Sequence, residues 1–162
     1  MRLEEFDALT AAAARDALLA CCASPQWAER VAAGRPYSDY SALEEAAADA
    51  VGALPWPQIE TALSAHPRIG ERAGGTSREA VWSRGEQSGA ADGDRAAFVE
   101  ANKAYEDRFG HVFLIRATGR TAEEMLSAAR ERLGNPEEAE REIVRAELAA
   151  ITRLRIGKLV TA

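Results

Sequence analysis

Apolar residues recur at intervals of three and four along almost the whole chain, which is the spacing of helices that each bury one face. The most regular stripe comprises Phe98, Ala101, Tyr105 and Phe109. The run Val112-Phe113-Leu114-Ile115 has the composition of a strand, but no second β-rich run is present to pair with it. We therefore predict an all-α fold in which this run is a buried extended connector.

Residues that favour helix ends stand between the apolar stripes. Helices are predicted to start at or near Thr10, Pro55 with Pro57, Thr76, Asp94, Thr121 and Pro136. The sequence Ser41-Ala42-Leu43-Glu44 has the form of a capping box, which satisfies two backbone N–H groups at the start of a helix. Pro67 disfavours helical geometry at the preceding residue, so the helix that contains Ile59 is predicted to end at His66.

The length and charge of the chain restrict its class and its partners. A chain of 162 residues suits one compact domain, and we expect a single multi-helix domain over residues 1–162. Lys and Arg number 20 and Asp and Glu number 26, so the formal charge is −6. This balance argues against binding to nucleic acid or anionic membranes and favours a small-molecule partner. With no signal peptide and no apolar run long enough to cross a bilayer, we expect a cytoplasmic protein.

Motifs for cofactors and metals are missing from the sequence. We find neither a phosphate-binding GxxxxGK nor a GxGxxG after a strand, and neither HExxH nor CxxC. The only cysteines, Cys21 and Cys22, are adjacent on an Ala- and Leu-rich segment, where we expect them to be buried and without a chemical role. We therefore expect no cofactor and no metal.

Arg155 lies where an apolar residue would be expected. Val144, Leu148 and Ile151 form a core-facing stripe on the last helix, and the next step of four residues reaches Arg155. Burying an unpaired guanidinium costs several kcal/mol to order of magnitude, so Arg155 needs a carboxylate partner or a ligand anion. In the alternative, its stem packs while its head reaches solvent or pairs with a structural Glu. The stripe alone leaves both interpretations open.

His66 is the more promising of the two histidines. At the C-terminal end of a helix its imidazolium would be favoured by the helix dipole, so it could act as a general acid or bind a hydroxyl group. A lone His beside a Pro is more often a cap for the last helical carbonyls, and position alone favours that structural role. His111 follows Gly110 beside an apolar run, and we interpret it as structural or exposed.

A second polar pair, Glu86 and Gln87, stands in a predicted loop between Gly85 and Gly93. A carboxylate accepts hydrogen bonds and an amide both donates and accepts them, so the pair could recognise the N–H and C=O groups of a ureide-like ligand. For an isolated Glu-Gln pair, a solvated loop without a binding role is the favoured interpretation.

Several motifs occur in a specific order and spacing over almost the full length of the chain. They are Gly34-Arg35-Pro36-Tyr37, His66-Pro67-Arg68-Ile69-Gly70, Trp82-Ser83-Arg84-Gly85-Glu86-Gln87, Asn102-Lys103-Ala104-Tyr105, Phe109-Gly110, Phe113-Leu114-Ile115, Thr118-Gly119-Arg120 and Arg153-Leu154-Arg155-Ile156. Together they resemble the 2-oxo-4-hydroxy-4-carboxy-5-ureidoimidazoline (OHCU) decarboxylase family, whose members catalyse the last step of urate degradation to (S)-allantoin. The resemblance implies an all-helical, cofactor-free carboxy-lyase that is typically a homodimer.

The resemblance also implies roles for individual residues. Catalytic roles fall on His66, Glu86 and Arg155. Substrate contacts fall on Pro67, Ser83, Gln87, Phe113, Leu114 and Ile115, the last three through backbone groups. The assignment requires that His66 and Arg155 meet across one enclosed hollow. Many members carry an aromatic-Pro pair where His111-Val112 stands here, so this wall of the expected pocket differs.

Two other functions stay open at this point. One is another cofactor-free lyase or hydrolase that acts on a ureide or a hydantoin. The other is a non-catalytic helical interaction module, in which Arg155 would pair internally and an exposed apolar patch would bind a protein.

Overall fold

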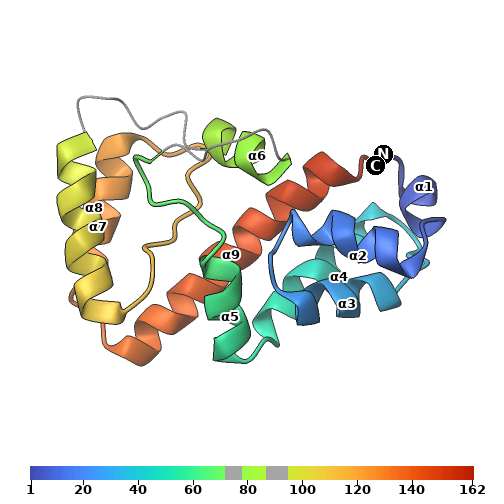
Figure 1. Ribbon diagram of the computed structural model, residues 1–162, viewed down its shortest axis with the longest axis horizontal. Helices are drawn as coiled ribbons and strands as arrows, with labels where there is room; N and C mark the ends of the chain where they lie inside the picture. The colour runs from blue at the N-terminus through green and yellow to red at the C-terminus, as the bar shows by residue number, and fades with distance from the viewer. Residues whose placement is uncertain (72–77, 87–94) are drawn as a thin grey trace. The chain divides into compact units, whose positions relative to one another are not determined.

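The computed structural model describes residues 1–71, 78–86 and 95–162, and within these ranges every regular element is an α-helix (Figure 1). The helices are α1 (Leu3–Asp7), α2 (Ala11–Leu19), α3 (Pro25–Ala33), α4 (Tyr40–Gly52), α5 (Trp56–Leu63), α6 (Arg78–Glu86), α7 (Arg95–Phe109), α8 (Ala122–Arg132) and α9 (Glu137–Leu159). The predicted all-α fold is confirmed. No helix of the described ranges has both the length and the apolar character needed to cross a membrane.

The chain forms two compact units, which we describe separately. The first unit contains residues 1–62 and 148–162, and the second contains residues 63–147. The long helix α9 contributes its C-terminal part to the first unit and its N-terminal part to the second. The expected single domain over residues 1–162 stays a prediction.

In the first unit, α2 packs on α3 and α3 packs on α4. The helices begin where side-chain oxygens satisfy free backbone N–H groups, since Thr10 accepts from the N–H of Ala13 and Ser24 from that of Trp27. The buried Trp27 indole donates a 2.8 Å hydrogen bond to the carbonyl of Ala47, which joins α3 to α4. The two chain ends lie side by side (Figure 1), and the Met1 ammonium donates to the Leu159 carbonyl at 2.9 Å.

The motif Gly34-Arg35-Pro36-Tyr37 has a structural role in this unit. The Arg35 guanidinium donates to the carbonyls of Phe6 and Leu9, both at 2.8 Å, and so ties the end of α1 to the segment after α3. The Tyr37 hydroxyl donates to the Val31 carbonyl at 2.7 Å. A Cβ atom at Gly34 would lie 2.5 Å from that hydroxyl oxygen, so any other residue at this position would displace the Tyr37 side chain.

In the second unit, α7 packs on α8 around an apolar cluster. The cluster comprises Ile69, Phe98, Ala101, Tyr105, Phe113, Ile115, Ala117, Ala122, Met125, Leu126 and Ala129. The predicted cap of α8 is confirmed, because the Thr121 hydroxyl accepts from the N–H of Glu124 at 3.1 Å. The connector prediction also holds, since residues 113–115 are buried and have neither helix nor strand structure.

Three predicted boundaries are wrong. The cap of α4 is Asp39 rather than Ser41, because Asp39 has an extended backbone and its carboxylate accepts from the N–H of Ala42 at 2.9 Å. Helix α5 ends at Leu63 rather than at His66, whose N–H instead donates to the Leu63 carbonyl at 3.0 Å. Helix α6 continues through Gly85, which was expected to lie in a loop. The expected helix starts at Thr76 and Asp94 fall outside the described residues.

Candidate functional site

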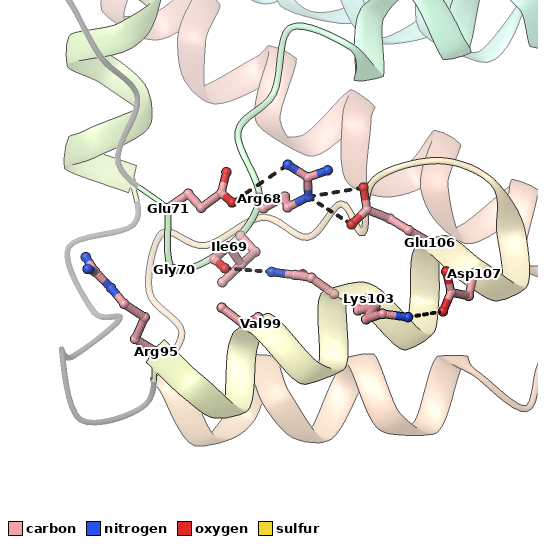
Figure 2. Close-up of a pocket in the computed structure, with 10 residues that line it drawn as sticks. Arg68, Ile69, Gly70, Glu71, Arg95, Val99, Lys103, Glu106 and Asp107 are labelled. Carbon is pink, nitrogen blue, oxygen red and sulfur yellow. Dashed lines mark hydrogen bonds and ion pairs between the residues drawn. The ribbon is translucent and has the colours of Figure 1, made fainter.

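The residues after His66-Pro67 are anchored to α7 (Figure 2). Figure 2 shows the Arg68 side chain between Glu71 and Glu106, and its Nε lies 2.9 Å and 3.2 Å from the two carboxylate oxygens of Glu106. The Asn102 amide donates a buried 2.8 Å hydrogen bond to the carbonyl of Ile69. These contacts fix the path of the chain directly after His66.

Gly70 completes this attachment. Its φ is +90°, a region that residues with a side chain rarely adopt, and a Cβ atom there would lie 3.0 Å from the Cβ of Phe98. The motif from His66 to Gly70 and the α7 motif around Asn102 are therefore two halves of one contact. His66 and Pro67 themselves are half-buried in the turn that follows α5.

A surface groove of about 750 Å³ lies between residues 68–71 and α7 (Figure 2). Its described lining is mostly charged, and Val99 contributes an apolar side chain that is 59% exposed. None of the residues expected to be catalytic is among the described residues that line it.

The buried connector at residues 113–115 is held from α8 and α9. The Leu114 carbonyl accepts a 2.8 Å hydrogen bond from Nη1 of Arg132, at the end of α8. Two residues later, the N–H of Arg116 donates to the Glu147 carboxylate on α9 at 2.9 Å. Side-chain groups from two helices thus take the place of strand partners for this connector.

Arg132 is itself held in a buried network. Nε of Arg132 donates to Oε1 of Glu140 at 2.7 Å, and the Tyr105 hydroxyl donates to the same oxygen at 2.6 Å. Asn135 donates to the other oxygen, Oε2, at 3.1 Å. The Glu140 side chain is fully buried, and the Arg132 guanidinium lies 4.6 Å from the centre of the Phe113 ring. The charges of Arg132 and Glu140 therefore compensate each other inside the second unit.

Burial raises the pKa of the Tyr105 hydroxyl, and the hydrogen bond to Glu140 raises it further. The phenol is therefore neutral at physiological pH and serves as a donor to the carboxylate. The His111 ring meets the Tyr105 ring edge-on at 5.5 Å between ring centres, which fits the structural role expected for His111.

Arg155 is buried on α9 in the first unit, with 1% of its surface exposed. Its neighbours on the predicted stripe, Leu148 and Ile151, are buried as well. Nη1 of Arg155 donates to the carbonyl of Ala20 at 3.4 Å. The alternative in which the guanidinium reaches solvent is therefore wrong.

A family model described as OHCU decarboxylase matches residues 7–157. The chain belongs to the OHCU decarboxylase family. A crystal structure of an OHCU decarboxylase in the presence of (S)-allantoin has 31% sequence identity to this chain and a TM-score of 0.78, and the match covers 91% of this chain and 99% of that one.

Curated relatives agree with this assignment. The OHCU decarboxylase of Amia calva is 32% identical over 141 residues, which are 84% of this chain and 81% of the relative. The uric acid degradation bifunctional protein TTL of Arabidopsis thaliana is 35% identical over 148 residues, which are 86% of this chain but 45% of the plant protein. The chain thus spans less than half of the plant protein. The resemblance, the all-α fold and the assignment to carboxy-lyases of urate degradation are confirmed.

The structure places the expected site residues in both units. His66, Pro67, Glu86 and residues 113–115 belong to the second unit, whereas Arg155 belongs to the first. The meeting of His66 and Arg155 across one hollow therefore stays a prediction. Glu86 is half-buried at the end of α6, so its predicted place in a loop is wrong. Ser83 lies in the same helix, and Gln87 falls outside the described residues.

Sequence reasoning assigned no role to Asn102, Arg132 or Glu140, although each one interrupts an apolar stripe. Asn102 lies four residues after Phe98, Arg132 three after Ala129, and Glu140 four before Val144. The rule that singled out Arg155 applies equally to these three polar residues.

In the described ranges, no group of three or more His, Cys, Asp or Glu side chains could hold a metal ion.

Proposed function

We propose that this chain decarboxylates OHCU to (S)-allantoin without a cofactor. The observation that carries the proposal is the match of residues 7–157 to the OHCU decarboxylase family model. It is supported by the similar solved structure, which was determined in the presence of (S)-allantoin.

The chemistry of the substrate explains why amino-acid side chains could suffice. OHCU bears a carboxylate and a hydroxyl on one ring carbon beside a C=N bond. When the bond to the carboxylate breaks, carbon dioxide leaves and the electron pair moves toward the imine nitrogen. The imine nitrogen takes up a proton, the hydroxyl oxygen becomes the carbonyl of allantoin as its own proton leaves, and a further proton is added to the neighbouring ring carbon, so that one proton is taken up from solvent overall. The face that receives this proton sets the (S) configuration.

Each expected site residue has a place in this proposal. His66 binds the hydroxyl and handles its proton, while Arg155 stabilises negative charge or a carbonyl. Glu86 and Gln87 hold the ureido arm. Pro67 and Ser83 contribute to the surrounding wall, and backbone groups of residues 113–115 complete it. Arg155 is suited to bind a charged ligand because it is a buried cation on an otherwise apolar stripe.

Chiral analysis of the product tests the activity. General acid-base catalysis typically contributes a factor of about 10² to 10⁴, and the substrate is labile in water, so the enzyme must also control stereochemistry. The protein should give (S)-allantoin in excess and faster than the uncatalysed reaction. A racemic product formed at the uncatalysed rate would show that the proposal is wrong.

Two substitutions test the assigned residues. His66→Ala should abolish decarboxylation while the helical circular dichroism stays that of the wild type, and full activity would exclude His66 from the chemistry. Arg155→Lys keeps the charge but loses the planar donor geometry, so substrate binding should weaken. Unchanged kinetic constants would instead indicate that Arg155 has only a structural role.

The oligomeric state and the location of the protein also belong to this proposal. We propose a homodimer, as the resemblance implies, and a cytoplasmic protein. Light scattering coupled to size-exclusion chromatography and cell fractionation test these two statements, and a monomer or a membrane-associated fraction would contradict them.

A further inference from the structure

We propose that Arg132 is a positioning residue for the reaction described above. By holding the carbonyl of Leu114, it directs the backbone groups of Phe113 and Ile115 toward the ureide ligand. The inference rests on the proposed function and extends it to a residue that the sequence motifs did not include.

One edge of the connector is already occupied by the protein. The Leu114 carbonyl accepts from Nη1 of Arg132 at 2.8 Å. The Arg116 N–H donates to Glu147 at 2.9 Å, and the Arg116 carbonyl accepts from Nε of Arg120 at 2.9 Å. Leu114 and Arg116 are two residues apart, so in an extended chain their backbone groups point to the same side.

The residues between them present the opposite edge. In an extended chain, the N–H and C=O groups of Phe113 and Ile115 point away from those of Leu114. Within the described part of the chain, these groups of Phe113 and Ile115 make no hydrogen bond. Since both residues are buried, at 2% and 4% exposure, their polar backbone groups need a partner.

A ureide suits such an edge. Backbone groups offer a donor and an acceptor in fixed alternation, and the ureido arm of OHCU carries N–H and C=O groups that can pair with them. The same kind of recognition occurs when an extended peptide is bound along a free strand edge. The connector would then fix the orientation of the ring for protonation from one face.

Arg132 is able to fix the connector because its guanidinium is held rigidly. It is bound by the buried Glu140 carboxylate through Nε and lies 4.6 Å from the centre of the Phe113 ring. Its planar group can reach Glu140 and the Leu114 carbonyl at the same time. A lysine at this position would keep the charge pair but lose this fixed double contact.

The experiment compares Arg132→Lys with two matched controls. Arg108 also donates to main-chain carbonyls at the end of α8, to Asn135 at 3.0 Å, so Arg108→Lys makes the same chemical change at another place. Arg130 is exposed on α8, and Arg130→Gly should destabilise that helix by about 1 kcal/mol without changing the connector. Each protein is titrated calorimetrically with (S)-allantoin, assayed with OHCU and melted.

We expect Arg132→Lys to raise the dissociation constant of allantoin and the KM of OHCU by about 5- to 10-fold. A weakening of this size corresponds to about one net hydrogen bond between protein and ligand. Its kcat should change by less than about twofold, because the lost contact acts on substrate and transition state alike. Both control variants should stay within about twofold of the wild type in affinity.

Each other outcome overturns a specific statement. If Arg132→Lys binds allantoin like the wild type, Arg132 does not position the connector. If Arg130→Gly loses as much stability as Arg132→Lys and weakens allantoin binding by the same factor, the role of Arg132 is only structural. If the wild type neither binds allantoin nor converts OHCU, the proposed function fails first and the inference falls with it.

A measurement on the wild type covers the case in which Arg132→Lys does not fold. When (S)-allantoin is added, the amide resonances of Phe113 and Ile115 should shift more than those of Leu114 and Arg116. Equal shifts of all four amides, or larger shifts at Leu114 and Arg116, would overturn the inference.

Discussion

The buried pair of Arg132 and Glu140 allows a quantitative test of what stabilises the second unit. Glu140 is fully buried and accepts hydrogen bonds from Tyr105, Arg132 and Asn135. Replacing Glu140 by leucine leaves the guanidinium buried without its carboxylate. Removal of one partner of a buried ion pair costs about 3–5 kcal/mol, and for a chain of this size about 1 kcal/mol lowers the Tm by about 2–4 °C. Glu140→Leu should therefore melt about 6–20 °C below the wild type.

The double variant distinguishes the free-energy cost of a buried unpaired charge from the net contribution of the ion pair to stability. Arg132→Met alone leaves the carboxylate uncompensated and should cost a similar amount to Glu140→Leu. Arg132→Met with Glu140→Leu leaves no buried charge, and a buried ion pair replaced by apolar residues is often tolerated. The Tyr105 hydroxyl and the Leu114 carbonyl lose their partners in this variant, so some destabilisation of about 1–3 kcal/mol remains. The double variant should thus be more stable than either single one.

The assay is equilibrium unfolding in urea followed by circular dichroism, with amide exchange along α8 as a local readout. Exchange is needed because the chain has two compact units and circular dichroism does not distinguish them. The coupling between the two substitutions should exceed about 2 kcal/mol, whereas independent sites add to within about 0.5 kcal/mol. Additive losses in the double variant would refute the reasoning, because they would show that neither charge depends on the other.

Three further predictions concern glycine, alkaline pH and a helix cap. Gly70→Ala should cost about 1–3 kcal/mol of stability in thermal melting and should reduce turnover, because φ is +90° and the added Cβ would crowd Phe98. In Gly119→Ala, φ is +80° but the added Cβ meets open space, so this variant should show only the cost of the strained backbone. Burial raises the pKa of Tyr105 above its ordinary value of 10.0, so the folded state holds this proton more tightly and the free energy of unfolding should fall as the pH rises above that value. Tyr105→Phe should flatten this fall in urea unfolding experiments across about pH 8 to 11. An unchanged dependence of stability on pH would show that Tyr105 is not its source. Asp39→Ala should destabilise α4 by about 1 kcal/mol whereas Ser41→Ala should be nearly neutral, and the reverse order in melting experiments would restore Ser41 as the cap.

Helix type and the approximate position of most helices were predictable because they depend on local periodicity. The stripe through Phe98, Ala101 and Tyr105 and the cap at Thr121 need only residues within one or two turns of each other. Helix boundaries were predicted less reliably, because local sequence can offer two suitable capping residues close together. Asp39 and Ser41 are both good capping residues, and the choice between them depends on which backbone is extended.

The site was predictable in part. Family motifs named His66, Glu86 and Arg155. Stripe analysis alone singled out Arg155 as a cation at an apolar position but left its burial open, and the structure shows it buried at 1% exposure. Gly85 suggested a loop, yet α6 continues through it, because a single glycine costs only about 1 kcal/mol in a helix and tertiary contacts can outweigh that. The motif around Asn102 gained its meaning only from the contact with Ile69, 33 residues earlier.

The sequence by itself determined that this chain is helical, which faces of the helices are apolar, and which family it belongs to, since all three are written in spacing and residue type. Only the tertiary structure decided the partners of the polar residues on those faces. Arg132 meets the Leu114 carbonyl 18 residues away and Tyr105 meets Glu140 35 residues away. A buried charge requires some partner wherever it lies, but which group satisfies it depends on distances between segments, and local periodicity carries no information about those distances.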